Sequence, residues 1–531
     1  MTNRRFRCIV IHINRFFILD YFSPLFLKNL IGALHPSLMD NGAFSAGTAL
    51  VPLPKYSFKG IGVILLHSKT LLIIKQRTSY LLVKYLSGKS IHYQQVLALA
   101  LPIFLEQAFI LGINFFNTAL ISTAGVAAIS AVNMVDSLNL LMTTILVAVA
   151  TGGTVVVAQY QGSRNQEMVS RSTEQTVAAV PLLALGLGLV LILFRDPILW
   201  LLFGSADADV FSNSRLYLLG SVLSYPAFGL YQGCVCCLRG VGRTRPALAL
   251  TLITNVSYVL LNLLFISVFH WGVIGMAVAV NIARGLGAVC SLLFLTRLDD
   301  TLHFEYRGAL RLNKDILRRI MYIGLPFAAE QVFFNGGKLL TQTYIVALGT
   351  LAITANAIVW SIIMVLQIPS NTISQVAVTI IGQCMGRRQV DDSRKFIRTF
   401  VILSSVCYLI MLLVVQPLLP GLIGVFNPPE QIVPEIRRIV IVTAIAMPFV
   451  WSLSFIIPAS IRAAGDAKFS SVVSLCCMWT LRVAGGWLLA IPFGLGLIGI
   501  YLAMILEWTV RSGIFLFRVK GNKWYAHHLI D

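Results

Sequence analysis

Twelve long apolar segments follow one another along this chain, and they constrain its fold more than any other feature. From about residue 95 onward, each segment exceeds the roughly 20 residues that an α-helix needs to cross a bilayer. The expected spans lie near 95–121, 131–158, 172–195, 209–237, 246–269, 273–297, 318–346, 352–381, 396–418, 433–460, 469–491 and 496–517. Only helices and closed barrels satisfy their backbone hydrogen bonds in lipid. The pattern predicts an all-α polytopic membrane protein with twelve transmembrane helices.

The composition agrees with a membrane protein, since 57% of the residues are hydrophobic and only 12% are charged. A soluble chain has about a quarter of its residues charged. The net charge of +20 raises the question of nucleic-acid binding. However, the basic residues form short clusters between the apolar segments, which is typical of the positive-inside rule. We therefore expect a small-molecule substrate and the lipid bilayer as partners of a monomer, and no nucleic acid. The nine cysteines have no metal-ligand spacing, and we expect no cofactor.

Basic residues follow every second span and predict the orientation of the chain. They are Arg164 and Arg171, Arg239, Arg243 and Arg245, Arg307, Arg311, Lys314, Arg318 and Arg319, Arg387, Arg388, Arg394 and Lys395, and Arg462 and Lys468. The other loops are short or carry acids. The positive-inside rule then places both termini in the cytoplasm, in agreement with an even number of spans.

Residues 1–90 differ from the rest of the chain. They hold twelve Lys and Arg and two acids, and their apolar pieces are too short or too interrupted to span a bilayer. The composition favours a poorly ordered, basic cytoplasmic extension that touches anionic lipid. A start codon placed too far upstream would look the same.

The two halves of the chain repeat each other at a constant offset, which sets Leu101 against Leu325. Without a gap, 101–164 matches 325–388 at sixteen of sixty-four positions. The repeat begins with LPIFLEQ at Leu101 and LPFAAEQ at Leu325, and later LRGVGRTRP echoes IRAAGDAKF. Six spans separate corresponding points, so both halves have the same orientation. Such parallel repeats predict two similar lobes with a cleft between them, the architecture of an alternating-access transporter.

The repeat also sets the expected domain boundaries. We expect an N-terminal six-helix lobe at 91–300 and a C-terminal six-helix lobe at 321–520. A cytoplasmic linker at 301–320 joins them, and a cytoplasmic tail occupies 521–531.

With these features the chain resembles the multidrug and toxic compound extrusion (MATE) family over roughly 92–520. The resemblance is carried by the LP start of the first and seventh spans, the polar patch FFNTALIS, the loops VAQYQGSRN and IGQCMGRRQ, and the two glycine-containing basic loops. It implies two six-helix lobes and export of small organic solutes, such as drugs, across a bacterial inner membrane, driven by inward flow of H⁺ or Na⁺. It extends to a branch suspected of exporting the flavin nucleotides FMN and FAD.

The chain departs from the family pattern at two positions. The family's first span usually carries an aspartate fifteen residues after its proline, where this chain has Asn117. Asparagine cannot release a proton, so a proton switch at that site is in doubt. Some members carry a glutamate eight residues after the proline of the seventh span, where this chain has Phe334. Glu330 lies one turn earlier on nearly the same face and could substitute for it.

Three acids at bilayer depth are candidates for ion coupling, namely Glu330, Glu106 and Asp136. Ionisable residues inside a membrane normally face the bundle interior or a water-filled path. Proton binding to such a carboxylate could bias the orientation of the lobes. The alternative is a hydrogen-bonded acid that holds helices together.

The candidates for lining a substrate cavity are cationic or polar. They are Lys338, Arg284, Arg482, Asn117, Gln107 and Gln331. The three cations suit a substrate with phosphate or carboxylate groups. The alternative for the cations is structural pairing with acids or helix-end carbonyls, and for the polar side chains it is hydrogen bonding between helices.

Other function classes fit the sequence less well. A lipid-linked oligosaccharide flippase of the wider superfamily would favour more spans, and a channel would not need the repeat. An enzyme would need a compact catalytic constellation, which the spans do not offer, so we expect no enzymatic activity. GxGxxG at 494–499 follows no strand, and the lack of a Walker motif argues against an ATP-driven pump.

Overall fold

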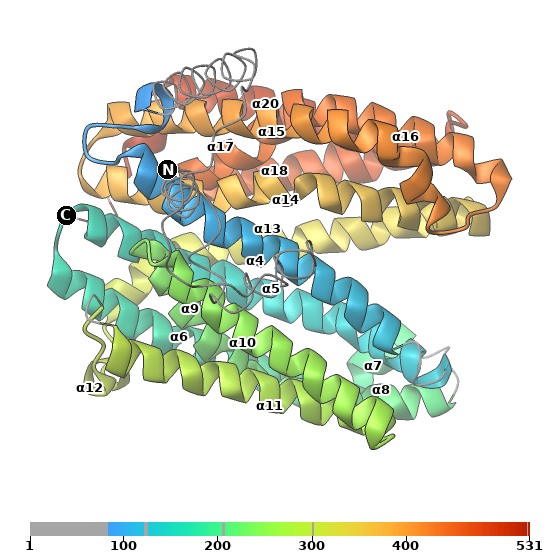
Figure 1. The fold of residues 1–531 in the computed structure, drawn as a ribbon, viewed down its shortest axis with the longest axis horizontal. Helices are drawn as coiled ribbons and strands as arrows, with labels where there is room; N and C mark the ends of the chain where they lie inside the picture. Colours follow the sequence, from blue (N-terminus) through green and yellow to red (C-terminus); the bar gives the residue numbers. More distant parts are fainter. Residues whose placement is uncertain (1–82, 122–125, 204–207, 300–301, 528, 531) are drawn as a thin grey trace, which may run out of the picture. The chain divides into compact units, whose positions relative to one another are not determined.

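The computed structural model describes residues 83–121, 126–203, 208–299, 302–527 and 529–530, and within these ranges every regular element is a helix (Figure 1). This confirms the predicted all-α fold class. Most of the expected N-terminal extension, residues 1–82, lies outside the described residues, and the expectation for it stays a prediction.

The first half of the chain forms the N-terminal lobe. Its helices are α4 (Tyr93–Ile121), α5 (Val126–Gly162), α6 (Gln166–Leu193), α7 (Arg195–Phe203), α8 (Ala208–Leu223), α9 (Tyr225–Gly240), α10 (Thr244–Asn262) continued by the π-helix η3 (Leu263–Val268), and α11 (Gly272–Leu293) continued by the π-helix η4 (Phe294–Leu298). The short helix α12 (Tyr306–Leu310) lies between the lobes in sequence and packs on α6. Within this lobe, α5 packs against α6, α8 and α9, and α10 packs against α11.

The second half forms the C-terminal lobe. Its helices are α13 (Lys314–Ala347), α14 (Thr350–Gly386), α15 (Val390–Gly424), η5 (Glu430–Ile432), α16 (Val433–Ala446), η6 (Met447–Trp451), α17 (Ser452–Ala463), α18 (Ala467–Cys477), η7 (Met478–Ala484), α19 (Gly485–Ala490), α20 (Gly496–Lys520) and η8 (Lys523–Tyr525). Helix α14 packs against α15 and α17, and α19 packs against α20. Helix α13 begins inside the expected linker 301–320.

Ten of the described helical segments are long and apolar enough to cross a membrane. An eleventh span is formed if α8 and α9, which bend by 43° at their junction, are counted together. Helix α13 is the remaining member of the repeat. It carries Glu330, Gln331, Asn335 and Lys338 along its middle, and these polar side chains make it less apolar than the other spans.

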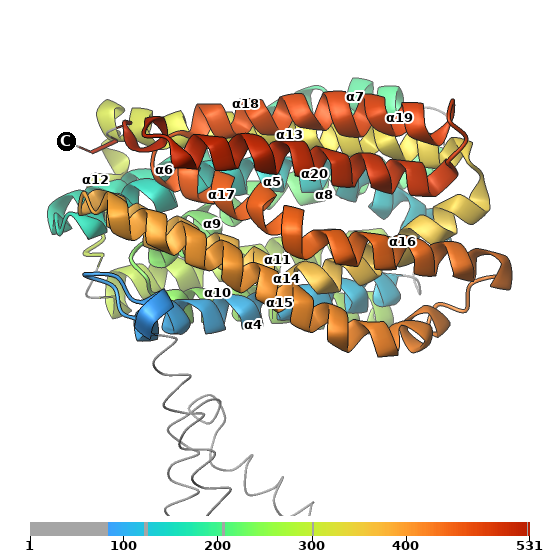
Figure 2. The same cartoon turned by 90° about the horizontal axis from the view of Figure 1, so that it is seen from above.

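The repeat seen in the sequence is also a repeat in space. Helix α4 contacts α10 of its own lobe and α14 of the other, whereas α13 contacts α18 of its own lobe and α5 of the other. Figure 1 shows α4, α5, α13 and α14 lying between the outer helices of the two lobes, and Figure 2, seen from above, shows the outer helices α15, α16 and α20 of the C-terminal lobe in front. Backbone details match as well. Arg164 and Arg388, which correspond to each other in the repeat, each lie two residues beyond the end of a helix and have positive φ, at 60° and 57°.

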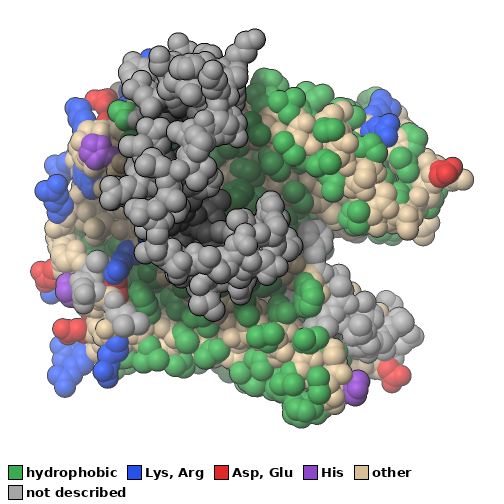
Figure 3. All heavy atoms as spheres, in the orientation of Figure 1, with side chains coloured by type: hydrophobic (Ala, Val, Ile, Leu, Met, Phe, Trp, Pro, Cys, Tyr) green, Lys and Arg blue, Asp and Glu red, His purple; other side chains and the backbone are tan. Residues whose placement is uncertain are grey.

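Most of the Lys and Arg side chains gather at one end of the helices, which we call the basic end (Figure 3). Arg164, Arg243 and Arg388 lie in its turns, and Lys468 lies in the first turn of α18. The described part of the chain also starts and finishes here. The backbone N–H of Lys89 donates to Asp392 at 2.6 Å, and Trp524 is buried in the tail. At the opposite end, Figure 3 shows an open gap between the two lobes.

Candidate functional site

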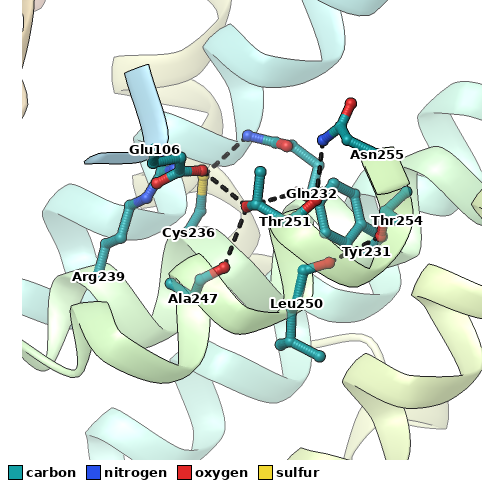
Figure 4. A network of polar contacts seen from close by, with 10 residues as sticks. All are labelled: Glu106, Tyr231, Gln232, Cys236, Arg239, Ala247, Leu250, Thr251, Thr254 and Asn255. Carbon is teal, nitrogen blue, oxygen red and sulfur yellow. Dashed lines mark hydrogen bonds and ion pairs between the residues drawn. The ribbon is translucent and has the colours of Figure 1, made fainter. Parts of the chain in front are cut away.

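The glutamates that mark the start of each lobe are both buried, and each is paired with an arginine. In the N-terminal lobe, Glu106 Oε1 lies 2.6 Å from Arg239 Nη2 and accepts a hydrogen bond of 2.7 Å from Thr251 (Figure 4). In the C-terminal lobe, Glu330 Oε2 lies 3.0 Å from Arg462 Nη1 and accepts a hydrogen bond of 2.8 Å from Ser471. Both carboxylates join the first helix of a lobe to two later helices of the same lobe.

These two ion pairs are equivalent under the repeat. The glutamates lie at the offset of the repeat, and the offset between the arginines is shorter by a single position. Charge positions alone would assign Arg239 and Arg462 to the loops, but their side chains fold back into the lobes, where Arg462 is 7% exposed and stacks 3.6 Å from the centre of the Phe327 ring. The matched spacing of Glu and Arg in both halves is the sequence signal that identifies the pairs.

Asp136 of α5 lies in a different setting, inside the N-terminal lobe. Its Oδ1 accepts hydrogen bonds from the Tyr217 hydroxyl at 3.2 Å and from Asn139 Nδ2 at 3.1 Å. Asn139 Oδ1 in turn accepts from Ser221 and Tyr225, at 2.9 and 2.7 Å. The carboxylate is half-buried, and among the described residues no ion pair joins it to an arginine or lysine.

Arg284 of α11 lies beside this network. Its Nη1 donates to Ser224 at 2.7 Å, and its guanidinium stacks 4.8 Å from the centre of the Phe228 ring. Ser224 follows Ser221 by one turn on the α8–α9 junction and donates to the Ser221 carbonyl at 2.6 Å. The hydrogen bonds thus link helices α5, α8, α9 and α11, at the bend where the fourth span is broken.

The C-terminal lobe holds cations where the N-terminal lobe holds Asp136. Trp360 occupies the repeat position of Asp136, and the ammonium of Lys338 lies 5.4 Å from its ring centre and 5.0 Å from that of Phe334. The Arg482 guanidinium lies 5.4 Å from the same Phe334 ring. Lys338 is accessible to solvent, and no acid forms an ion pair with it within the described ranges.

Arg482 belongs to a buried charge triad that borders this site. Its Nη2 lies 2.9 Å from Glu507 Oε2, and Arg511 Nη1 lies 2.9 Å from Glu507 Oε1. Glu507 is 0% exposed. With two arginines, one glutamate and Lys338, the group carries a net charge of +2. Buried charges of this kind are stable only when they are paired, and Lys338 is the member left accessible.

The remaining candidates are Gln107, Gln331 and Asn117. Gln107 and Gln331 are half-buried and follow the two glutamates on α4 and α13. Asn117 lies in α4, but its side chain is outside the described residues. The candidates therefore divide into the two Glu–Arg pairs, an acidic network in the N-terminal lobe and a cationic aromatic site in the C-terminal lobe.

Two lobes of repeated helices, each with its own polar site inside the membrane-spanning region, define this molecule as a two-lobed helical membrane transporter. The MatE family model matches residues 102–268 and 326–488, one stretch in each lobe and together more than half of the chain. The chain belongs to this family, the MATE transporters. It is a multi-pass membrane protein of the efflux-transporter class.

Named relatives support this assignment. The chain is 25% identical to "Uncharacterized transporter YisQ" of Bacillus subtilis (strain 168), over 80% of this chain and 94% of that protein. It is 23% identical to "Probable multidrug resistance protein NorM" of Thermotoga maritima, over 81% and 93%. The fold matches a solved MOP superfamily transporter from Pyrococcus furiosus Vc1 (DSM3638), described as having a binding pocket of reverse polarity, with a TM-score of 0.72 at 16% identity over 80% and 94%.

Proposed function

We propose that this protein exports small organic anions with a planar ring, such as FMN or FAD, across a bacterial inner membrane in exchange for protons. The basic end faces the cytoplasm, and both termini lie there. The two lobes alternate access to sites near the middle of the membrane. The observation that carries the substrate class is the accessible Lys338 between two aromatic rings, beside Arg482.

The chemistry of this site fits a flavin nucleotide better than a cationic drug. A phosphate group forms charge-assisted hydrogen bonds with a lysine ammonium or an arginine guanidinium. The rings of Phe334 and Trp360 offer faces on which an isoalloxazine ring can stack. A cationic substrate would meet a net charge of +2 in the same place. The reverse polarity described for the Pyrococcus furiosus transporter is a precedent for such a variation among proteins of this fold.

Asp136 is the group that we assign to proton coupling. Glu106 and Glu330 each neutralise an arginine that is at least half-buried, so protonating either would leave that cation without its partner. Within the described residues, Asp136 forms no ion pair with an arginine or lysine, and its neighbours Tyr217 and Asn139 donate hydrogen bonds to it. A single carboxylate is enough to bind a proton, whereas a metal cation needs several oxygen ligands. Protonation would weaken the hydrogen bond from Tyr217 and so loosen α5 from α8.

The substrate proposal predicts that Lys338→Ala lowers uptake of FMN into inverted membrane vesicles roughly 10- to 100-fold, since a hydrogen bond to a charged group contributes about 1.5–3 kcal/mol. Uptake of riboflavin, which lacks the phosphate, should change little. Lys338→Arg should keep most of the FMN uptake. The measurement compares FMN, FAD, riboflavin and a cationic dye in the same vesicles.

Lys468→Ala is the matched control, because Lys468 also lies over an aromatic ring, 5.1 Å from that of Tyr322, but at the basic end. Its FMN uptake should equal that of the parent. Unchanged FMN uptake by Lys338→Ala would rule out the anion site. Uptake that responds to neither a proton nor a sodium gradient would rule out antiport.

A further inference from the structure

Two glutamine side chains cross between the lobes at the basic end. Gln159 of α5 donates from Nε2 to the backbone carbonyl of Ala463 at 2.8 Å, and Gln383 of α14 donates from Nε2 to the carbonyl of Gly240 at 3.1 Å. Ala463 and Gly240 are the last residues of α17 and α9. Carbonyls in the last turn of a helix have no partner inside that helix. Each glutamine therefore caps a helix end of the opposite lobe.

The backbones around these glutamines are in direct contact. A Cβ placed on Gly162 would lie 2.1 Å from the backbone oxygen of Gln383, and one placed on Gly386 would lie 1.8 Å from that of Gln159. Only glycine allows helices α5 and α14 to approach this closely. The two glutamines correspond to each other in the repeat, as do the two glycines, so the same contact is made twice, once from each lobe.

Each capped carbonyl also follows directly after an arginine that a buried glutamate holds. Gly240 follows Arg239, which pairs with Glu106, and Ala463 follows Arg462, which pairs with Glu330. The Glu–Arg pair of one lobe thus fixes the position of the carbonyl to which the glutamine of the other lobe binds. This gives the two glutamates a positioning duty that is the same in both lobes.

The two contacts differ in one respect. Thr379 of α14 donates to the carbonyl of Arg239 at 3.0 Å and adds a second bond beside that of Gln383. Its repeat counterpart is Val155, which has no hydroxyl. The closure on α9 therefore has two side-chain hydrogen bonds and the closure on α17 has one.

We propose that Gln159 and Gln383 are the latch of the cytoplasmic gate. Both hydrogen bonds are present while the lobes are closed at this end, and both must break for the substrate to enter from the cytoplasm. The proposal rests on the alternating-access function proposed above and adds the gate residues to it. Both side chains are uncharged, so the strength of the latch does not itself depend on pH or salt. The proton-linked group and the latch are then separate parts of the cycle.

The test measures gate opening by amide hydrogen exchange of the full-length protein in nanodiscs, without substrate or ion gradient. Exchange is followed at 158–163, around the end of α5, and at 382–388, around the end of α14. A single net hydrogen bond corresponds to a shift of roughly 3- to 10-fold in an equilibrium constant. We expect exchange in both segments to rise by that factor in Gln159→Ala and in Gln383→Ala, and by roughly 10- to 100-fold in the double variant.

Gln161→Ala is the matched control, since Gln161 lies close to the latch on the same helix and its side chain makes no hydrogen bond to the other lobe within the described ranges. Its exchange should equal that of the parent. Equal exchange in the double variant and in this control would overturn the proposal. So would a lower melting temperature of the double variant without faster exchange in these two segments.

A second variant separates hydrogen bonding from packing. Gln159→Glu keeps the size of the side chain, but its carboxylate cannot donate to Ala463, whereas its neutral acid can. Relative to the parent at the same pH, we expect fast exchange at high pH and slow exchange at low pH. A ratio of variant to parent exchange rates that does not change with pH would overturn the latch proposal. The exchange experiment uses no substrate or ion gradient, so it tests the latch even if the antiport proposal is wrong. Conversely, a negative result for the latch does not contradict antiport.

Discussion

Replacing Glu507 with glutamine should lower the free energy of unfolding by about 3–5 kcal/mol, which is the usual cost of breaking a buried ion pair by removing one partner. Glu507 is fully buried between Arg482 and Arg511, which are themselves 6% and 2% exposed. Its loss leaves two guanidinium groups buried without a counter-charge, because both are held at 2.9 Å from the same carboxylate. The C-terminal lobe should therefore unfold at a clearly lower temperature.

The measurement is thermal unfolding of the purified protein in detergent, followed by tryptophan fluorescence. Glu430→Gln is the control, since Glu430 is exposed at the end away from the basic loops, and a surface change of this kind stays within about 0.5 kcal/mol. Adding Arg482→Met to Glu507→Gln should recover part of the loss, because one uncompensated charge is then removed. Equal unfolding temperatures for Glu507→Gln and Glu430→Gln would contradict a dry, buried triad.

The architecture can be predicted from the sequence because the membrane leaves few alternatives. Long apolar runs must become helices, and a constant offset with matched prolines and glutamates is too regular for unrelated segments. The structure confirms the helical fold and reproduces the repeat down to the φ angles of Arg164 and Arg388. The broken fourth span cannot be located in this way, since a bend at Ser224 keeps the same apolar composition on both sides.

The partners of the charged residues are harder to predict. Glu106 and Glu330 stand out in the sequence as acids in apolar runs, but their arginines fall among the basic residues of the loops. A long side chain at a helix end can turn either toward the solvent or back into the bundle, and only tertiary packing decides between these directions. The same holds for Lys338. Its spacing from Phe334 is that of one helical turn, whereas Trp360 and Arg482 come from other helices.

The two lobes differ in the groups that lie at the centre of their polar sites. Asp136 and Trp360 occupy equivalent positions, and each lies at the centre of the polar site of its lobe. A carboxylate in one lobe and a cationic aromatic site in the other allow coupling and substrate binding to be placed on different lobes. A change in the hydrogen bonds of α5 then reaches the other lobe through α13 and α14, which pack directly on it.

This division of roles predicts that Asp136→Asn uncouples export from the proton gradient while it leaves the fold intact. Asparagine is nearly the same size, and its carbonyl oxygen can still accept from Tyr217 and Asn139, but it cannot bind or release a proton. Coupling between two sites typically corresponds to roughly a 5- to 150-fold change, so we expect gradient-driven FMN uptake into inverted vesicles to fall by about that factor. Exchange of FMN at equal concentrations, without a gradient, should continue.

Substrate-dependent proton movement is the readout that a structural role of Asp136 would not reproduce. A pH-sensitive dye should report proton release on addition of FMN to energised vesicles of the parent, and none with Asp136→Asn. Asp209→Asn is the control, because Asp209 is an exposed carboxylate on α8, the helix that also carries Tyr217. Proton release at the parent rate by Asp136→Asn would contradict the assignment. The other two candidates for binding the proton are Glu106 and Glu330, and protonating either would leave Arg239 or Arg462 without its counter-charge.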